Sequence, residues 1–147
     1  MQFPYSCGRP EVAPLIAAAK QKGIGVVVRQ GLEGDLLTDK FRPGHQFTDR
    51  ANDWWAGIDP ACMAEALQRL DAIRRQFVKP PYPTLAQVAL AYVLSNPDVS
   101  ATIPGAGRPA EMRDNLSVND LPLLPAGTVK DLTEAADGRR RLMRQKK

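Results

Sequence analysis

Residues 23–29 form a short run, GIGVVVR, that is rich in β-branched side chains and shows no alternation of polar and apolar positions. Strands that are covered on both faces have this pattern, which is typical of buried parallel sheets. Residues 99–103 are another strand candidate, and residues 2–6 count as a first, very short strand. We therefore expect a parallel sheet of about three strands.

Helical patterns separate these candidate strands. Gly23 is placed to end a first helix, residues 59–60 (Asp-Pro) are a typical helix start, and residues 84–87 (TLAQ) form a capping box. A short helix is expected after Pro109, and a last one over about residues 128–144. The side chains expected to face the core include Met63, Leu67, Leu70, Phe77, Val129, Leu132 and Ala136. Strands that alternate with helices in this way define an α/β protein with right-handed crossovers.

The number of strand–helix units is small. A complete (β/α)8 TIM barrel takes about 250 residues and eight such units, whereas this chain has 147 residues and three units. Residues 1–147 are therefore expected to form one α/β domain. Its expected architecture is a partial (β/α)8 TIM barrel with about three parallel strands and flanking helices.

The net charge of +4 is concentrated in a basic tail at residues 138–147. This tail carries six basic residues and no acid, which leaves 14 basic against 16 acidic residues elsewhere. A basic tail can hold nucleic acid electrostatically, but without interleaved aromatic residues it is more typical of a solvated helix end. Nucleic acid is therefore not an expected partner.

The sequence gives no sign of a membrane span, a secretion signal or a metal site. No apolar stretch approaches the roughly 20 residues that a membrane-spanning helix needs, and the first residues do not form a secretion signal. A cytoplasmic location without membrane contact is expected. Cys7 and Cys62 have neither metal-ligand nor redox spacing, so both are expected to be reduced thiols. His45, the one histidine, lies in a polar loop and is expected at the surface.

The sharpest chemical signal is the turn at residues 105–108, Gly-Ala-Gly-Arg, between the last candidate strand and a helix. Glycines let backbone amides approach an anion, and the amino terminus of the following helix attracts negative charge. In TIM barrels the loops after the last two strands commonly form a phosphate site. The turn therefore predicts a phosphate site, although a strand-to-helix turn also uses glycine for conformational reasons alone.

Three segments of the sequence together match one pattern. They are residues 103–115, IPGAGRPAEMRDN, residues 25–41, GVVVRQGLEGDLLTDKF, with Asp49-Arg50 further along, and residues 2–6, QFPYS. In that order they resemble the last strand and cofactor helix, the seventh strand with its following loop, and the sixth strand of the aldo-keto reductase family. The resemblance covers nearly the whole chain. It implies the carboxy-terminal, cofactor-binding part of a nicotinamide-dependent carbonyl oxidoreductase.

The resemblance also implies the cofactor contacts. Gln2 corresponds to the glutamine that hydrogen-bonds the nicotinamide carboxamide. Arg29 stands where the family usually has an aromatic platform for the nicotinamide ring, and an arginine can still stack by its planar face. Lys40 and Arg50 correspond to residues that contact the cofactor's phosphates. The residues implied to bind NADP or NAD are Gln2, Arg29, Gln30, Leu32, Gly34, Lys40, Arg50, Gly105, Gly107, Arg108, Glu111 and Asn115.

Two positions depart from the family's pattern. Gly107 lacks the hydroxyl often present for the 2′-phosphate of NADP, and Glu111 replaces a more usual neutral or basic residue, while Arg108 offers a compensating charge. The sequence therefore leaves both NADP and NAD open. The family's catalytic aspartate, tyrosine, lysine and histidine belong to the first half of its barrel, so none of the four is assigned in this chain.

Two functions remain open at this point. In the first, the chain is a truncated aldo-keto reductase-like oxidoreductase fragment that binds NADP or NAD weakly, lacks the catalytic tetrad and is inactive alone. In the second, it is a non-catalytic assembly or interaction module derived from the family. An incomplete sheet exposes strand edges and an apolar face. We therefore expect either a homo-oligomer, most simply a dimer, or a partner that supplies the missing amino-terminal half.

Overall fold

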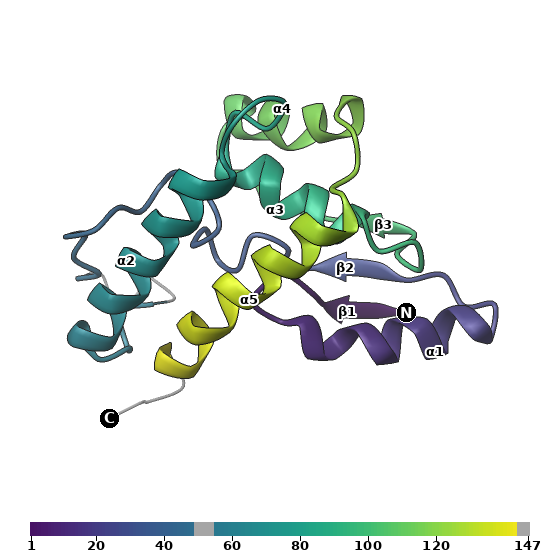
Figure 1. The fold of residues 1–147 in the computed structure, drawn as a ribbon, viewed down its shortest axis with the longest axis horizontal. Coiled ribbons are helices and arrows are strands. Elements are labelled where there is room, and N and C mark those ends of the chain that lie inside the picture. Colours follow the sequence, from purple (N-terminus) through teal and green to yellow (C-terminus); the bar gives the residue numbers. More distant parts are fainter. Residues whose placement is uncertain (49–54, 144–147) are drawn as a thin grey trace.

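The computed structural model of the chain describes residues 1–48 and 55–143. Its strands form a three-stranded parallel sheet in the order β1-β2-β3, which lies to one side of the molecule (Figure 1). The strands are Gln2–Pro4, Val27–Arg29 and Ala101–Thr102. The register places Phe3 opposite Val28, and Val28 opposite Thr102. The predicted parallel α/β sheet is confirmed, and it is not closed into a barrel.

Five α-helices and two short 3-10 helices accompany the sheet in the described residues. They are η1 (Pro10–Val12), α1 (Ala13–Gln21), α2 (Pro60–Phe77), α3 (Leu85–Leu94), α4 (Pro109–Ser117), η2 (Val118–Asp120) and α5 (Ala126–Met143). Asp59 begins α2 by accepting hydrogen bonds from Ala61 N and Cys62 N. Thr84 begins α3 by accepting one from Gln87 N. Gly23 follows α1 with a φ of +68°, so these local start and stop signals are confirmed.

The strands are shorter than the sequence predicts. β1 ends at Pro4, β2 begins at Val27, and β3 holds only two residues. Ser100 N and Ala101 N both donate to Val26 O, at 2.8 and 3.2 Å, while Ser100 Oγ accepts from Val26 N at 3.0 Å. Because two successive amides share one carbonyl, the ladder is irregular at this point. Regular pairing of β2 with β3 begins with Val27 opposite Ala101.

The capping box at α3 forms only in part. In a complete box the side chain of Gln87 would reach back to the backbone of Thr84. Instead, Gln87 Nε2 donates to Asp114 Oδ1 at 3.0 Å and to Ser117 Oγ at 2.8 Å. Both acceptors belong to α4, so Gln87 ties two helices together rather than capping one.

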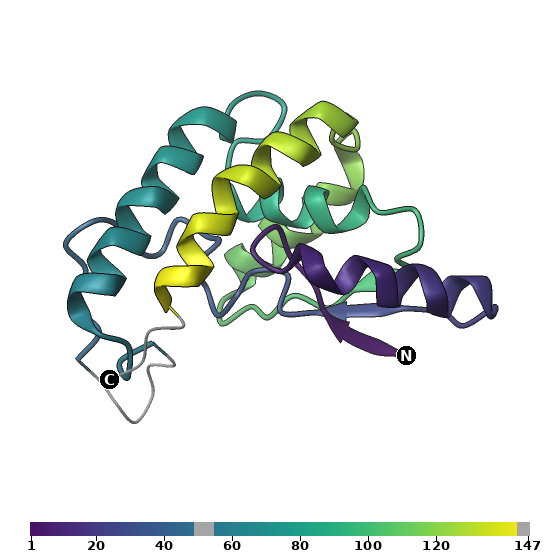
Figure 2. The same cartoon turned by 60° about the horizontal axis from the view of Figure 1, so that its bottom comes forward.

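The core lies between the helices and one face of the sheet. The predicted inward positions of α2 and of α5 are buried, with Val129 half-buried. Helix α3 is buried over almost its entire circumference, as its apolar sequence predicts. Figure 2 shows α1, α3 and α5 on the same side of the sheet.

Residues 1–48 and 55–143 leave the opposite face of the sheet uncovered. Phe3 and Val28 point toward the helices, whereas the alternate positions Gln2 and Arg29 are exposed. Ile103, whose N–H donates to Val28 O and so extends the ladder, is 52 % exposed. An apolar side chain this exposed in line with a strand marks a surface that the other strands of a barrel would cover.

The described residues contain no helix that is long and apolar enough to span a membrane. In the same part of the chain, no cluster of three histidine, cysteine, aspartate or glutamate residues is arranged to hold a metal ion. Cys7 and Cys62 form no disulfide. His45 is exposed, as expected, with its ring against those of Phe41 and Phe47.

Candidate functional site

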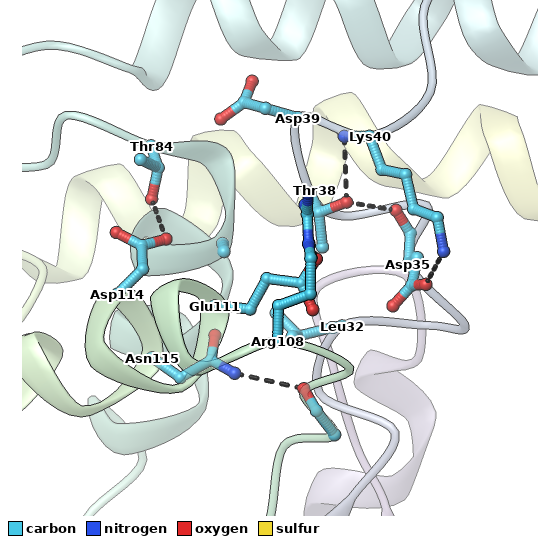
Figure 3. Close-up of a pocket in the computed structure, with 12 residues that line it drawn as sticks. Leu32, Asp35, Thr38, Asp39, Lys40, Thr84, Arg108, Glu111, Asp114 and Asn115 are labelled. Atoms are coloured by element: carbon cyan, nitrogen blue, oxygen red, sulfur yellow. Dashed lines mark hydrogen bonds and ion pairs between the residues drawn. The ribbon is translucent and has the colours of Figure 1, made fainter.

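A pocket of about 270 Å³ lies beyond the carboxyl ends of β2 and β3. Its walls are the loop that follows β2, the start of α3 and the start of α4 (Figure 3). Open parallel sheets and barrels bind their ligands at this end of the strands, where loops from neighbouring units converge. The pocket is therefore the candidate functional site of the chain.

The loop after β2 is held in an unusual backbone conformation. Gln30, Glu33 and Asp35 have φ values of 57°, 47° and 67°, in the left-handed region that disfavours residues other than glycine. Each such residue costs about 1–3 kcal/mol and persists only where its surroundings impose it, commonly at ligand sites. Leu36 and Leu37 are completely buried, so their burial helps to hold the loop in this conformation.

Two further contacts fix this loop against its surroundings. The hydroxyl of Ser6, directly after β1, donates a hydrogen bond to Glu33 Oε1, and both side chains are buried. Trp55 Nε1 donates to Gly34 O at 2.7 Å. Gly34 has a φ of +58°, and a Cβ there would lie 3.2 Å from Trp55 Nε1. Position 34 therefore favours glycine both for its backbone conformation and for the close contact with the indole.

Asp39 connects the loop to two helices. Its Oδ1 accepts from Arg74 Nε on α2 at 2.7 Å, and its Oδ2 accepts from Leu85 N at the start of α3 at 3.1 Å. Arg74 also donates to the carbonyl oxygens of Thr38 and Phe41, at 3.0 and 3.2 Å. The side chain of Arg74 is only 8 % exposed. This buried guanidinium therefore fixes the segment that presents Lys40 to the pocket.

Replacing Asp39 by asparagine is expected to lower the free energy of unfolding by about 2 kcal/mol, because Arg74 loses its closest carboxylate and keeps only Asp71, at 3.1 Å, as an ionic partner. Glu65→Gln is the matched control, since it breaks the exposed Arg69–Glu65 pair and should cost less than about 0.5 kcal/mol. Urea denaturation followed by circular dichroism measures both. Equal urea midpoints for the two variants would contradict the role of Asp39 in holding the loop against α2 and α3.

The turn before α4 forms the opposite wall. Asn115 Nδ2 donates to Gly105 O at 3.1 Å, and Gly107 N donates to Glu111 Oε2 at 2.8 Å. Arg108 donates to Glu111 Oε1 through Nε at 2.9 Å and Nη2 at 2.7 Å. The hydrogen bonds from Arg108 and then from the Gly107 amide lower the pKa of Glu111. Its carboxylate is therefore ionised at neutral pH.

Helices α3 and α4 are joined at the base of the pocket. Thr84 Oγ1 donates to Asp114 Oδ2 at 2.9 Å (Figure 3), and the other carboxylate oxygen of Asp114 accepts from Gln87. Because the hydroxyl of Thr84 also accepts from the backbone of α3, one side chain both begins a helix and positions its neighbour.

Half of the residues predicted from the sequence line this pocket. They are Leu32, Lys40, Gly105, Arg108, Glu111 and Asn115. Gly107 contacts one of them, Glu111, and Gln30 and Gly34 belong to the same loop without lining the pocket. Gln2 and Arg29 are exposed on the uncovered face of the sheet, away from the lining, and Arg50 lies outside the described residues. A cofactor-binding role stays a prediction for all twelve positions.

The sequence did not single out the other half of the lining. Those residues are Asp35, Thr38, Asp39, Thr84, Ala86 and Asp114. Thr84 carried a signal as the start of the capping box, and Asp39 and Asp114 each stand beside a residue that was predicted. Their ion-pair and hydrogen-bond partners on other elements left no local pattern.

The chemistry of the described lining is suited to binding. It holds amides, hydroxyls and charged groups, but no tyrosine, histidine or cysteine. The described lining contains one lysine, Lys40, whose Nζ lies 2.7 Å from Asp35 Oδ2. The pocket can therefore hydrogen-bond a polar ligand.

Comparison with known proteins gives a consistent family. A model described as the aldo/keto reductase family matches residues 1–137. A curated protein of Arabidopsis thaliana, named "probable voltage-gated potassium channel subunit beta", is 30 % identical over 105 residues. That match covers 69 % of this chain and 32 % of the Arabidopsis protein. The chain thus spans about a third of this relative's length.

Solved structures show the same fold over nearly the whole chain. An aldo-keto reductase from Bacillus halodurans in its holo form has a TM-score of 0.63 at 21 % identity, covering 92 % of this chain and 42 % of that one. A glycerol dehydrogenase from Gluconobacter oxydans has a TM-score of 0.65 at 16 % identity, covering 92 % and 41 %. At these identities the likeness establishes the fold, and the chain corresponds to about two fifths of each structure.

Proposed function

The chain belongs to the aldo/keto reductase family, and on that premise we propose that it is the nicotinamide-cofactor-binding part of an aldo-keto reductase barrel. Its ligand is NAD(H) or NADP(H), held across the loop after β2 and the start of α4. Reduction of a carbonyl substrate requires, in addition, the catalytic groups of the strand–helix units that this chain does not span.

The observation that carries this proposal is the convergence of two distant segments on one pocket. Lys40 comes from the loop after β2, and Gly105, Arg108, Glu111 and Asn115 come from the turn and helix after β3. The family resemblance implies a cofactor contact for all five. Their convergence at the carboxyl end of a parallel sheet, where such folds bind ligands, supports one common ligand.

The glycines of the turn support a ligand rather than a purely conformational requirement. Neither Gly105 nor Gly107 has a positive φ. A Cβ at Gly105 would meet nothing within 4 Å, so no protein atom excludes a side chain there. Glycine at this position leaves open space beside backbone amides, which is what the close approach of a phosphate needs.

NADH and NADPH are expected to bind the isolated chain in the high micromolar range or more weakly, since roughly half of the usual contacts are absent and each tenfold loss takes only about 1.4 kcal/mol. Gly105→Ala should weaken this binding at least about tenfold by filling the space the phosphate needs. Its folding stability should change by less than about 0.5 kcal/mol. Titration of the ¹⁵N-labelled chain followed by NMR measures dissociation constants of this size.

Gly57→Ala is the matched control for that titration. Gly57 also has open space around its Cβ position and no positive φ, but it does not line the pocket. The control should bind both cofactors like the unaltered chain. A nanomolar dissociation constant for the unaltered chain would contradict the expected weak binding, and equal affinity of the two alanine variants would count against the proposed site.

A second candidate function is a non-catalytic assembly module. Two observations favour it: the uncovered face of the sheet around Arg29 and Ile103, and the name of the Arabidopsis relative, which describes a probable channel subunit. In this case association would be the main property of the chain, and the cofactor titrations would show no saturable binding.

A further inference from the structure

We infer that this pocket selects its cofactor by charge, and that Glu111 makes it prefer NAD(H), with a free ribose 2′-hydroxyl, over NADP(H), with a 2′-phosphate in that place. The inference rests on the proposed cofactor site and goes beyond it, because the family allows either cofactor. Three features of the described pocket carry it: its charge balance, the contacts of Glu111 and the state of its cations.

The charge balance of the lining is negative. Its carboxylates are Asp35, Asp39, Glu111 and Asp114, and its cations are Lys40 and Arg108. Asp39 is compensated from outside the lining by Arg74, at 2.7 Å. A phosphate monoester brings a further charge of about −1.5 to −2 at pH 7. Like charges at short range repel unless a cation stands between them, so a 2′-phosphate meets an unfavourable potential here.

Both cations of the lining are already engaged by carboxylates. Lys40 Nζ lies 2.7 Å from Asp35 Oδ2 (Figure 3), and Arg108 Nη2 lies 2.7 Å from Glu111 Oε1. A 2′-phosphate would have to displace one of these partners. The displaced carboxylate then stays ionised beside the phosphate, and this repulsion offsets part of what the new contact gains.

Glu111 occupies the donors that an anion would use. Its Oε2 accepts the N–H of Gly107 just before α4, and its Oε1 accepts two N–H groups of the Arg108 guanidinium. Backbone amides before a helix and a forked guanidinium are the groups that commonly bind phosphate. The chain's own carboxylate therefore sits where a 2′-phosphate would be recognised.

The same carboxylate is suited to a ribose with free hydroxyls. An acidic side chain accepts hydrogen bonds from ribose hydroxyls in many NAD-binding sites, where it also excludes the 2′-phosphate. Recruitment of Arg108 or Lys40 by a phosphate would reverse this preference, since their side chains are 76 % and 57 % exposed. A direct measurement of the two cofactors decides between these outcomes.

The test compares NADH with NADPH, and AMP with 2′,5′-ADP, on the ¹⁵N-labelled chain at low salt. The Gly107 amide, a donor to Glu111, is a local reporter. In each pair, the unaltered chain should bind the ligand that lacks the 2′-phosphate at least about tenfold more tightly than the ligand that carries it. This ratio corresponds to about 1.4 kcal/mol. In Glu111→Gln, which removes the charge but keeps the size, this ratio should fall to within about threefold.

Glu134→Gln is the matched control, because it removes one negative charge, as Glu111→Gln does. Glu134 is exposed on α5, outside the pocket, and lies 3.9 Å from Lys130, so its loss should leave the ratio unchanged. If none of the four ligands binds saturably, the proposed function itself fails. If they bind but NADPH equals or exceeds NADH, or Glu111→Gln leaves the ratio unaltered, the charge selection is wrong while the cofactor site stands.

Discussion

Reduction of 4-nitrobenzaldehyde by the 147-residue chain alone is expected to be unmeasurable with either NADH or NADPH. The family resemblance places the general acid, a tyrosine, in the half of the barrel that this chain does not span. A positioned general acid alone contributes about 10²–10⁴-fold to rate. Loss of the groups that orient the carbonyl lowers the rate further, because proximity and electrostatic stabilisation are lost with them.

The tyrosines of this chain are not suited to replace the missing acid. Tyr5, Tyr82 and Tyr92 are buried and do not line the pocket. Burial raises the pKa of Tyr82 and that of Tyr92, whereas a general acid working near neutral pH needs its pKa lowered toward that range. Their hydroxyls are also engaged, with Pro122 O in the case of Tyr82 and with Thr133 in the case of Tyr92.

The assay follows nicotinamide absorbance with the aldehyde in excess, and a complete aldo-keto reductase serves as the positive control. Tyr5→Phe and Tyr82→Phe variants purified in parallel reveal any contribution of this chain. Turnover that survives rigorous purification and disappears in one of these variants would overturn the expectation. Turnover that is equal in all preparations would come from a contaminating enzyme.

In sedimentation velocity at micromolar concentration, the chain is expected to run as a twofold dimer of about 32 kDa, twice its mass of 16.1 kDa. In the part of the chain that the structure describes, no strand lies next to the outer backbone edges of β1 and β3, and one face carries the exposed side chain of Ile103. Open edges and exposed apolar faces favour association. Twofold symmetry is the commonest way for one surface to cover itself.

A pair of charge substitutions locates the dimer contact. Ile103→Glu places a carboxylate on the uncovered face and should shift the chain to monomer. Leu15→Glu is the control, because Leu15 is 57 % exposed and Ile103 is 52 % exposed. Leu15 lies on α1, away from the uncovered face, so this variant should remain a dimer. A single species near 16 kDa without concentration dependence would show that the chain needs no second copy.

The helices were predictable because their boundary signals are local. Asp59 accepts from amides two and three residues ahead, Thr84 from an amide three residues ahead, and Gly23 needs only its own φ. Each signal works within one turn of the chain. The strand limits were less predictable, because β3 begins where Ser100 and Ala101 share the carbonyl of Val26, a contact across two segments.

The candidate site divides in the same way. Lys40, Gly105 and Asn115 could be predicted because they belong to contiguous motifs. Asp39 could not, since its importance comes from Arg74, 35 residues further along the chain, and from Leu85, 46 residues further. Such pairs form only after the loop is folded onto two helices.

The sequence alone therefore determined the α/β alternation, the parallel order of the strands and the family, because capping residues, β-branched runs and contiguous motifs act over a few residues. The tertiary structure decided which charges meet. It placed Asp39 against a buried guanidinium, and it left Ile103 on an uncovered face. Both outcomes depend on the packing of distant segments, and electrostatic and burial energies are set by that packing rather than by spacing along the chain.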